Sequence, residues 1–138
     1  MAIRFFQEGV SFPFHQRNKT KAWIKDCVTQ EGHDLQELNV IFCDDEYLHT
    51  LNITYLQHDT LTDIITFPYQ EDPIHGELYI SIDRIRENAT SNAVPFLHEL
   101  RRVIIHGTLH LCGYGDKTTA EKQKMRLKEN HYLSLLAD

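Results

Sequence analysis

The sequence predicts one α/β domain of the α+β type, in which a small mixed sheet of about four strands packs with helices. Short β-prone segments alternate with segments whose hydrophobic residues recur at helical spacing. A chain of 138 residues, 41% of them hydrophobic, is long enough for one core and short for two. No repeat, low-complexity tract or Gly/Ser-rich linker divides it, so residues 1–138 are expected to form a single domain.

The first half of the chain is expected to alternate strands and helices. Residues 17–32 carry apolar side chains at helical spacing ahead of a closing glycine, whereas residues 37–44 place an apolar run between polar ends. The expected elements are a strand over 3–7, a helix over 17–32, a strand over 37–44, and a helix over 44–56 with Tyr47, Leu48, Leu51 and Tyr55 on its apolar stripe.

The second half is expected to begin with a hairpin and to end in helices. Strands over 63–69 and 77–82 are separated by a turn that Pro73 and Gly76 punctuate. Three helices are expected to follow: one from Asp83, one from Pro95 to Cys112 that Gly113 ends, and one after Thr118 and Glu121, which have capping-box spacing.

Charge and hydropathy exclude several classes of protein. A net charge of −6 and a pI near 5.8 argue against a protein that coats nucleic acid by charge, so any nucleic-acid contact is expected to be local and no DNA partner is expected. No segment approaches the ~20 apolar residues of a membrane span, and the N-terminus has no run of signal-peptide length. We therefore expect a soluble, cytoplasmic protein without a membrane partner.

Cysteine usage points to free thiols. Cys27, Cys43 and Cys112 form an odd set without CxxC spacing, which favours neither a disulfide framework nor a thiolate zinc site. Cys112 is either a soft metal ligand or a small buried hydrophobe, and the second interpretation is favoured.

The stretch HGTLHLCGYGD, residues 106–116, carries a candidate metal site. His106 and His110 are four residues apart, so one helix face can aim both imidazoles at one point. Gly113 and Gly115 allow the chain to turn back and bring Asp116 to the same place. Three protein ligands with an open fourth position are typical of a catalytic zinc, so we expect one Zn²⁺ per chain. The structural alternatives are a pair of partly buried histidines and an aspartate that serves a turn.

The same stretch resembles the HGxLHLxGxDH signature of the YbeY family of bacterial metal-dependent endoribonucleases. LNITYLQHDTLTDIITFP (51–68) is similar to the family's LNxxYR and PTDVLSFP segments, and GELYISI (76–82) to its GDIxIS strand. The resemblance implies a mixed-sheet domain with zinc on a helix and the loop after it. It also implies cleavage of single-stranded RNA, action in 16S rRNA 3′-end maturation and late-stage 70S ribosome quality control, and rRNA and the ribosome as partners.

Three departures from the family pattern bear on the chemistry of the site. Carried over by position, the zinc ligands fall on His106, His110 and Asp116, where Asp116 replaces the usual histidine and remains a competent ligand. Leu56 stands where the family has an arginine, and Leu61 where it has a proline. Leu56 removes a cation that could contact phosphate, so another basic residue takes its place or activity is weaker.

Gly107 bears on the reaction. A zinc protease carries its catalytic glutamate after the first histidine of this motif, and glycine cannot take a proton. Gly107 is instead expected to let the helix approach the sheet. Phosphodiester cleavage, which depends mainly on charge stabilisation, suits the site better, with either water or the RNA 2′-hydroxyl as the attacking group.

Other polar residues are candidates for supporting roles. Thr62 and Asp63 are candidate catalytic residues, with a turn as their structural alternative. Arg101, Arg102 and Lys117 form a candidate RNA-contact patch, with solvated surface charge as the alternative. The basic residues of the last helix are expected on an exposed face, interleaved with Glu121 and Glu129.

Two other functions remain open from the sequence. Leu56 and the absent base motivate a non-catalytic, ribosome-associated RNA-binding factor with a structural zinc. The HxxxH pair motivates another zinc hydrolase, such as a protease, which Gly107 disfavours.

Overall fold

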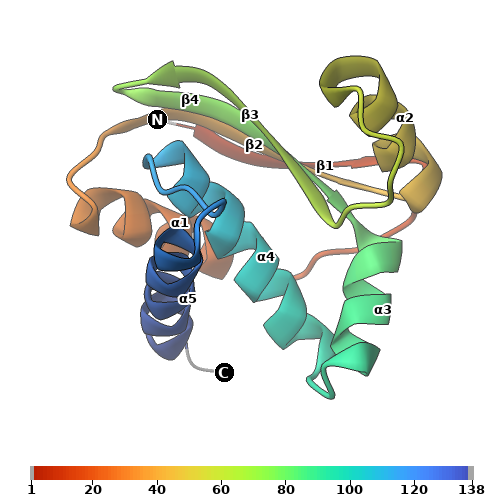
Figure 1. Cartoon of the computed structure of the whole chain (residues 1–138). Helices are drawn as coiled ribbons and strands as arrows, with labels where there is room; N and C mark the ends of the chain where they lie inside the picture. The colour runs from red at the N-terminus through yellow and green to blue at the C-terminus, as the bar shows by residue number, and fades with distance from the viewer. Residues whose placement is uncertain (1, 137–138) are drawn as a thin grey trace.

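The computed structural model describes residues 2–136, over which a four-stranded sheet packs with five helices (Figure 1). The elements are β1 (Ala2–Glu8), α1 (Arg17–Gln30), β2 (Leu35–Cys43), α2 (Asp45–Leu56), β3 (Ile64–Glu71), β4 (Ile74–Ser81), α3 (Ile82–Ser91), α4 (Phe96–Leu111) and α5 (Thr119–Ser134). Every expected element is present, so the α+β prediction with a sheet of about four strands is confirmed.

The sheet is mixed, with the strand order β1-β2-β4-β3. β1 pairs with β2 and β2 with β4 in parallel, whereas β3 and β4 form the predicted antiparallel hairpin. The turn is shorter than expected, because Gly76 lies within β4. A Cβ at Gly76 would come within 2.7 Å of Leu111 Cδ2, so this glycine permits α4 to pack on the strand.

The helices are divided unequally between the faces of the sheet. α1, α4 and α5 lie on one face and α2 on the other, while α3 packs against α4 near one end of the sheet (Figure 1). The main core fills the space between the sheet and the first group, with Leu38, Leu78 and Ile104 fully buried. Trp23 Nε1 donates a 2.8 Å hydrogen bond to the Tyr132 carbonyl and joins α1 to α5 inside this core.

A smaller apolar cluster lies under α2, with Cys43, Leu48 and Ile65 at its centre. Tyr55 was expected on the apolar stripe of this helix, but its side chain is exposed. Tyr55 makes an edge contact with the Phe67 ring of β3, but this contact does not bury the Tyr55 side chain.

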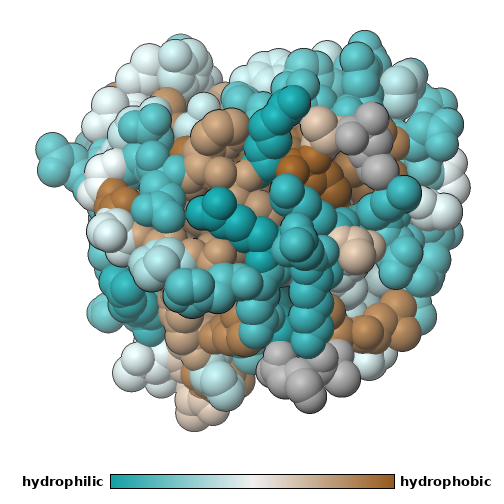
Figure 2. All heavy atoms as spheres, turned by 180° about the vertical axis from the view of Figure 1, so that it is seen from behind, coloured by the Kyte–Doolittle hydropathy of each residue, from teal (hydrophilic) through white to brown (hydrophobic). Residues whose placement is uncertain are grey.

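Seen from behind, the surface is mostly hydrophilic, with patches of hydrophobic side chains between the polar ones (Figure 2). Exposed hydrophobic residues are normal on a folded domain, because polar atoms cannot cover the whole surface. Over residues 2–136, none of the helices combines the length and the apolar character that crossing a membrane requires. Cys27, Cys43 and Cys112 are free, as expected, and all three are buried, as was expected of Cys112.

Candidate metal centre

Helix α4 carries both histidines of the candidate site and lies close to the sheet. A Cβ at Gly107 would come within 2.7 Å of Ile64 Cδ1 and 2.8 Å of Leu78 Cδ2. Only glycine gives the helix this approach, so the predicted structural role of Gly107 is confirmed. The close contact fixes the helix that carries His106 and His110 against β3 and β4.

The end of α4 turns the chain back toward the histidines. Gly113 has a φ of +103°, its N–H donates to the His110 carbonyl at 3.0 Å, and the Tyr114 N–H donates to the Leu109 carbonyl at 3.1 Å. This pair of bonds is a Schellman motif, which ends a helix through a left-handed residue. Asp116 follows two residues later.

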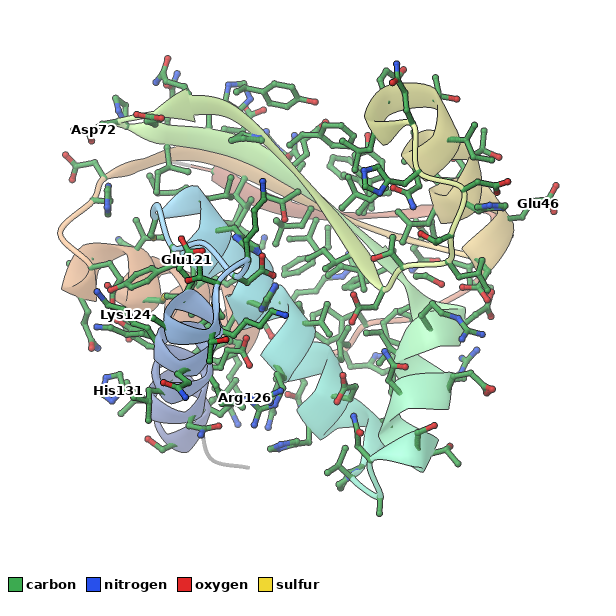
Figure 3. The ribbon with its side chains drawn as sticks, viewed as in Figure 1. Glu46, Asp72, Glu121, Lys124, Arg126 and His131 are labelled. Carbon is green, nitrogen blue, oxygen red and sulfur yellow. The ribbon has the colours of Figure 1, made fainter. Side chains whose placement is uncertain are left out.

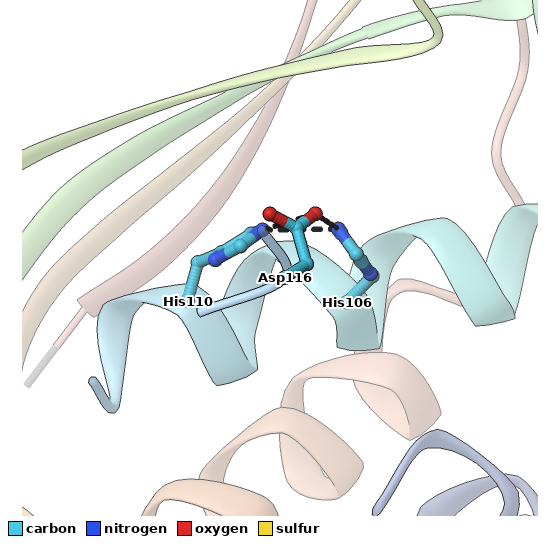
Figure 4. Close-up of side chains that lie close together, drawn as sticks. All are labelled: His106, His110 and Asp116. Carbon is cyan, nitrogen blue, oxygen red and sulfur yellow. Dashed lines mark hydrogen bonds and ion pairs between the residues drawn. The ribbon is translucent and has the colours of Figure 1, made fainter. Parts of the chain in front are cut away.

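The three predicted side chains converge on one point (Figure 4). The Nε2 atoms of His106 and His110 are 3.0 Å apart, and Asp116 Oδ2 lies 3.3 Å from each of them. The histidines are about three-quarters buried, whereas Asp116 is 41% exposed, so the group is open to solvent on the side of the carboxylate.

Hydrogen bonds at the far side of each ring decide which imidazole nitrogens face this point. His106 Nδ1 lies 2.7 Å from Glu129 Oε2, and His110 Nδ1 lies 2.8 Å from the Tyr114 carbonyl oxygen. An ionised carboxylate and a carbonyl only accept, so both Nδ1 atoms carry protons. In the neutral rings both Nε2 atoms therefore present lone pairs to each other and to Asp116.

Such an arrangement suits a bound cation. Two lone pairs and a carboxylate oxygen within 3.3 Å repel one another unless positive charge lies between them. A tetrahedral zinc with ligands at about 2.0–2.1 Å holds its donor atoms roughly 3.3 Å apart, which matches the observed separations. The group of His106, His110 and Asp116 can therefore hold a metal ion, and its donors fit zinc.

Glu129 is a part of the site that the sequence interpretation missed. It was expected on an exposed face, but its side chain is 5% exposed, because it fills the gap between α5 and α4. It accepts from His106 and, at 2.8 Å, from an Arg102 guanidinium nitrogen. Helical spacing from the buried Met125 and Tyr132 was the available signal, since positions 125, 129 and 132 share one face.

The Glu129 and His106 pair is electrostatically polarised. Burial raises the pKa of the Glu129 carboxyl, but the hydrogen bonds from His106 and Arg102 outweigh it and hold this pKa below its ordinary value. Burial likewise opposes protonation of His106, yet the bond to Glu129 and the charges of Glu129 and Asp116 raise its pKa overall. A carboxylate behind a metal-ligating histidine fixes its tautomer and makes it more basic.

A second buried carboxylate supports the His110 side. The Glu31 carboxylate accepts hydrogen bonds from the Tyr114 hydroxyl at 2.5 Å, from the Tyr132 hydroxyl, and from Lys128 Nζ at 3.1 Å. Because the Tyr114 carbonyl accepts from His110, this cluster anchors the residue that orients the second histidine. Glu31 lies at the end of α1, so three helices meet behind the site.

A pocket of about 390 Å³ opens beside His106 and Asp116, between α4, α5 and the start of β3. Asp63 lines it, and burial raises the pKa of the Asp63 carboxyl above its ordinary value despite the nearby His106. Thr62 is absent from this wall, and its hydroxyl donates to the Ile64 carbonyl at 3.3 Å. Of the two candidate helpers, the structure brings only Asp63 to the pocket.

The three residues of the candidate RNA-contact patch lie in different surroundings. Arg101 is buried and donates to Gln16 Oε1 at 2.7 Å, away from the pocket, because its face of α4 packs toward the start of α1. Arg102 lines the pocket but is held by Glu129 and by Asn130. Lys117 is exposed beside Asp116.

The remaining departures from the family pattern are on the surface. Leu56 and Leu61 are both exposed, on α2 and in the loop after it, and neither lines the pocket. Cys112 is buried, and burial raises the pKa of its thiol to about 12, which disfavours the thiolate that a metal would need.

The fold is a mixed-sheet α+β domain whose His–His–carboxylate group lies beside an open pocket. Three donors with room for a further ligand are typical of a catalytic metal site, so the chain is of the class of small domains whose donor group could hold such a metal. The sequence model of the family described as Endoribonuclease YbeY matches residues 3–137. The chain belongs to the endoribonuclease YbeY family, so the suspected resemblance and the expectation of an enzyme are confirmed.

Individual relatives agree over nearly the whole chain. The chain is 48% identical to the endoribonuclease YbeY of Amoebophilus asiaticus (95% of this chain, 90% of the relative). It is 47% identical to that of Flavobacterium psychrophilum (94% of both). The solution structure of TM1509 from Thermotoga maritima superposes with a TM-score of 0.72 at 29% identity, over 98% of this chain and 89% of that one.

Proposed function

We propose that this chain is a single-strand-specific, zinc-dependent endoribonuclease. The observation that carries the proposal is the convergence of the His106 and His110 Nε2 atoms with Asp116 Oδ2 beside an open pocket, which His106 and Asp116 line. Relatives at 41–48% identity are named endoribonucleases, which supports RNA as the substrate. When bound, zinc supplies Lewis-acid stabilisation of the negative charge that develops on phosphate oxygens.

The chain's own residues hold and orient this centre. Glu129 and the Tyr114 carbonyl fix the proton of each histidine on Nδ1, so both Nε2 atoms stay available as ligands. Gly107 supplies no base. The buried Asp63 carboxyl, whose pKa lies above its ordinary value, is the proposed proton carrier in the pocket, because it retains a proton at higher pH than an exposed aspartate.

The proposed setting is the cytoplasm, with the ribosome as partner. We propose action in 16S rRNA 3′-end maturation and in late-stage quality control of the 70S ribosome, which the family resemblance implies. A chain with a net charge of −6 suits a substrate presented by a larger particle better than tight binding of RNA in solution.

The test uses one labelled RNA in two forms, single-stranded and annealed to its complement, with the metal content of each preparation measured. We expect cleavage of the single strand alone and loss of cleavage with a chelator. Analysis of the product ends separates the two attacking groups, because a 2′,3′-cyclic phosphate forms only when the 2′-hydroxyl attacks. Binding to RNA or ribosomes without cleavage by metal-loaded protein would contradict the proposal and favour a binding factor.

A further inference from the structure

The α5 wall of the pocket carries two cations that no role described so far uses. Lys122 and Arg126 both line the pocket, across from His106. They are four residues apart on one helix, so they share a face and lie about 6 Å apart along its axis. Figure 3 shows Arg126 on the side of α5 that faces α4, and Lys124 on the opposite side.

Both cations have donors left for a ligand. Within residues 2–136, the Lys122 ammonium takes part in no hydrogen bond or ion pair. Arg126 is 62% exposed and lies 3.6 Å from Glu129, whose carboxylate is already engaged by His106 and Arg102. At 3.6 Å this contact is longer than a hydrogen bond, so it does not hold the largely exposed guanidinium in place.

A neighbouring hollow extends this face of the helix. Thr119, Lys122, Gln123, Arg126 and Leu127 line a cavity of about 530 Å³ next to the pocket. The Leu127 side chain is 69% exposed, so it does not pack in the core as a leucine of an amphipathic helix usually does. An exposed leucine beside two cations offers an apolar surface for a flat ring and charge for a phosphate.

We propose that α5 holds a nucleotide adjacent to the bond that is cut, with its phosphate on Lys122 and Arg126 and its base against Leu127. This inference rests on the proposed function, since it places the scissile phosphate at the group of His106, His110 and Asp116. Arg126 binds a phosphate with two parallel hydrogen bonds and Lys122 adds a point charge. Arg102 of α4 also lines the pocket, but it is already held by Glu129 and Asn130. The positive charge that contacts the phosphate therefore comes from α5.

The experiment measures binding of a labelled single-stranded RNA by fluorescence anisotropy in chelator, and cleavage by metal-loaded protein, across a salt series. The Lys122→Gln/Arg126→Gln variant is expected to bind about tenfold more weakly, because both side chains that it replaces are charged donors to phosphate. Its log Kd should depend less on log salt, by about 0.7 for each phosphate that the variant no longer neutralises. KM should rise while kcat changes little.

Two further variants separate this subsite from general charge. Lys124→Gln also removes a cation from α5, but from the side that faces away from the pocket. The Lys124 ammonium lies 5.4 Å from the centre of the Tyr114 ring, so this variant should leave RNA binding unchanged. Leu127→Ser should weaken binding without altering the salt dependence, because it removes no charge. Thermal unfolding of each variant checks that the fold is intact.

The outcomes distinguish this inference from the proposed function. Wild-type protein that cleaves RNA, together with a double variant whose KM and salt dependence are unchanged, would overturn the α5 subsite alone. An equal loss in Lys124→Gln would also overturn it, since general charge would then explain the effect. Wild-type protein that neither binds nor cleaves RNA would overturn both.

Discussion

The Glu129 carboxylate lies 2.7 Å from His106 Nδ1, although 23 residues separate them in the chain. This bond points the His106 Nε2 lone pair at His110 and Asp116. The buried Glu129 carboxylate also accepts a hydrogen bond from Arg102, which offsets its charge. The bond joins α5 to α4, which carries both histidines, so the last helix is part of the candidate metal centre.

Replacing Glu129 with glutamine is expected to weaken metal binding by about 10–100-fold, because the amide neither fixes the Nδ1 proton as firmly nor makes the ring as basic. Competition with a chromophoric chelator measures the affinity. Glu46→Gln removes the same charge from α2, far from the site in Figure 3, and serves as the control. Equal affinity in the two variants would show that the bond does not tune His106.

Asp116→Ala is expected to lose stoichiometric metal and keep the fold, because the side chain is 41% exposed and contributes little to the core. Asp116→His restores a nitrogen donor of the kind that the family pattern carries at this position, and it should retain the metal. Metal analysis and circular dichroism of both proteins are the measurements. Retention of one metal per chain in the alanine variant would remove Asp116 from the ligand set.

Gly107→Ala is expected to lower the free energy of unfolding by about 1–3 kcal/mol through overpacking. The new methyl group would meet Ile64 and Leu78 side-chain atoms at 2.7–2.8 Å. The sign of the change is diagnostic, since alanine in an open helix position stabilises by about 1 kcal/mol. Stabilisation in a denaturant titration would therefore mean that α4 does not depend on this close approach.

Glu31→Gln should change how stability responds to acid. Burial raises the pKa of the Glu31 carboxyl, but hydrogen bonds from Tyr114, Tyr132 and Lys128 hold it below its ordinary value of 4.5. The stabilisation is therefore complete above that ordinary value and is lost as the pH falls through the lower, folded-state pKa.

At neutral pH the Glu31→Gln variant should be less stable by about 1–3 kcal/mol. Its free energy of unfolding should then fall less than that of the wild type as the pH is lowered from about 5 toward 3. Denaturant titrations across this range measure both quantities. Parallel pH curves for the two proteins would show that Glu31 does not carry this acid dependence.

The sequence predicted the parts of the site that depend on local geometry. The spacing of His106 and His110 and the helix stop at Gly113 follow from helix periodicity and glycine conformation, so Asp116 could be placed from a few neighbouring residues. Glu129 and Glu31 could not be placed in this way, because their partners come from helices far apart in the chain. In the sequence Glu129 looks like any other acidic residue of a charged helix, and only packing against α4 buries it.

The same limit applies to the cations, because their surroundings depend on packing between helices. Arg101 and Arg102 are close to His106 in sequence, but packing turns Arg101 toward Gln16 and pairs Arg102 with Glu129. Lys122 and Arg126 reach the pocket from a separate helix, and nothing in their local sequence indicates it.

The central claim is that RNA cleavage depends on a metal held by His106, His110 and Asp116. Cleavage of a labelled single-stranded RNA is measured with the wild type and with His110→Ala, each as purified, after chelation, and after zinc is added back. We expect wild-type cleavage that disappears on chelation and returns with one zinc per chain, and none in the variant under any condition. Equal cleavage by His110→Ala, or by chelated wild type, would contradict a metal-dependent nuclease at this site.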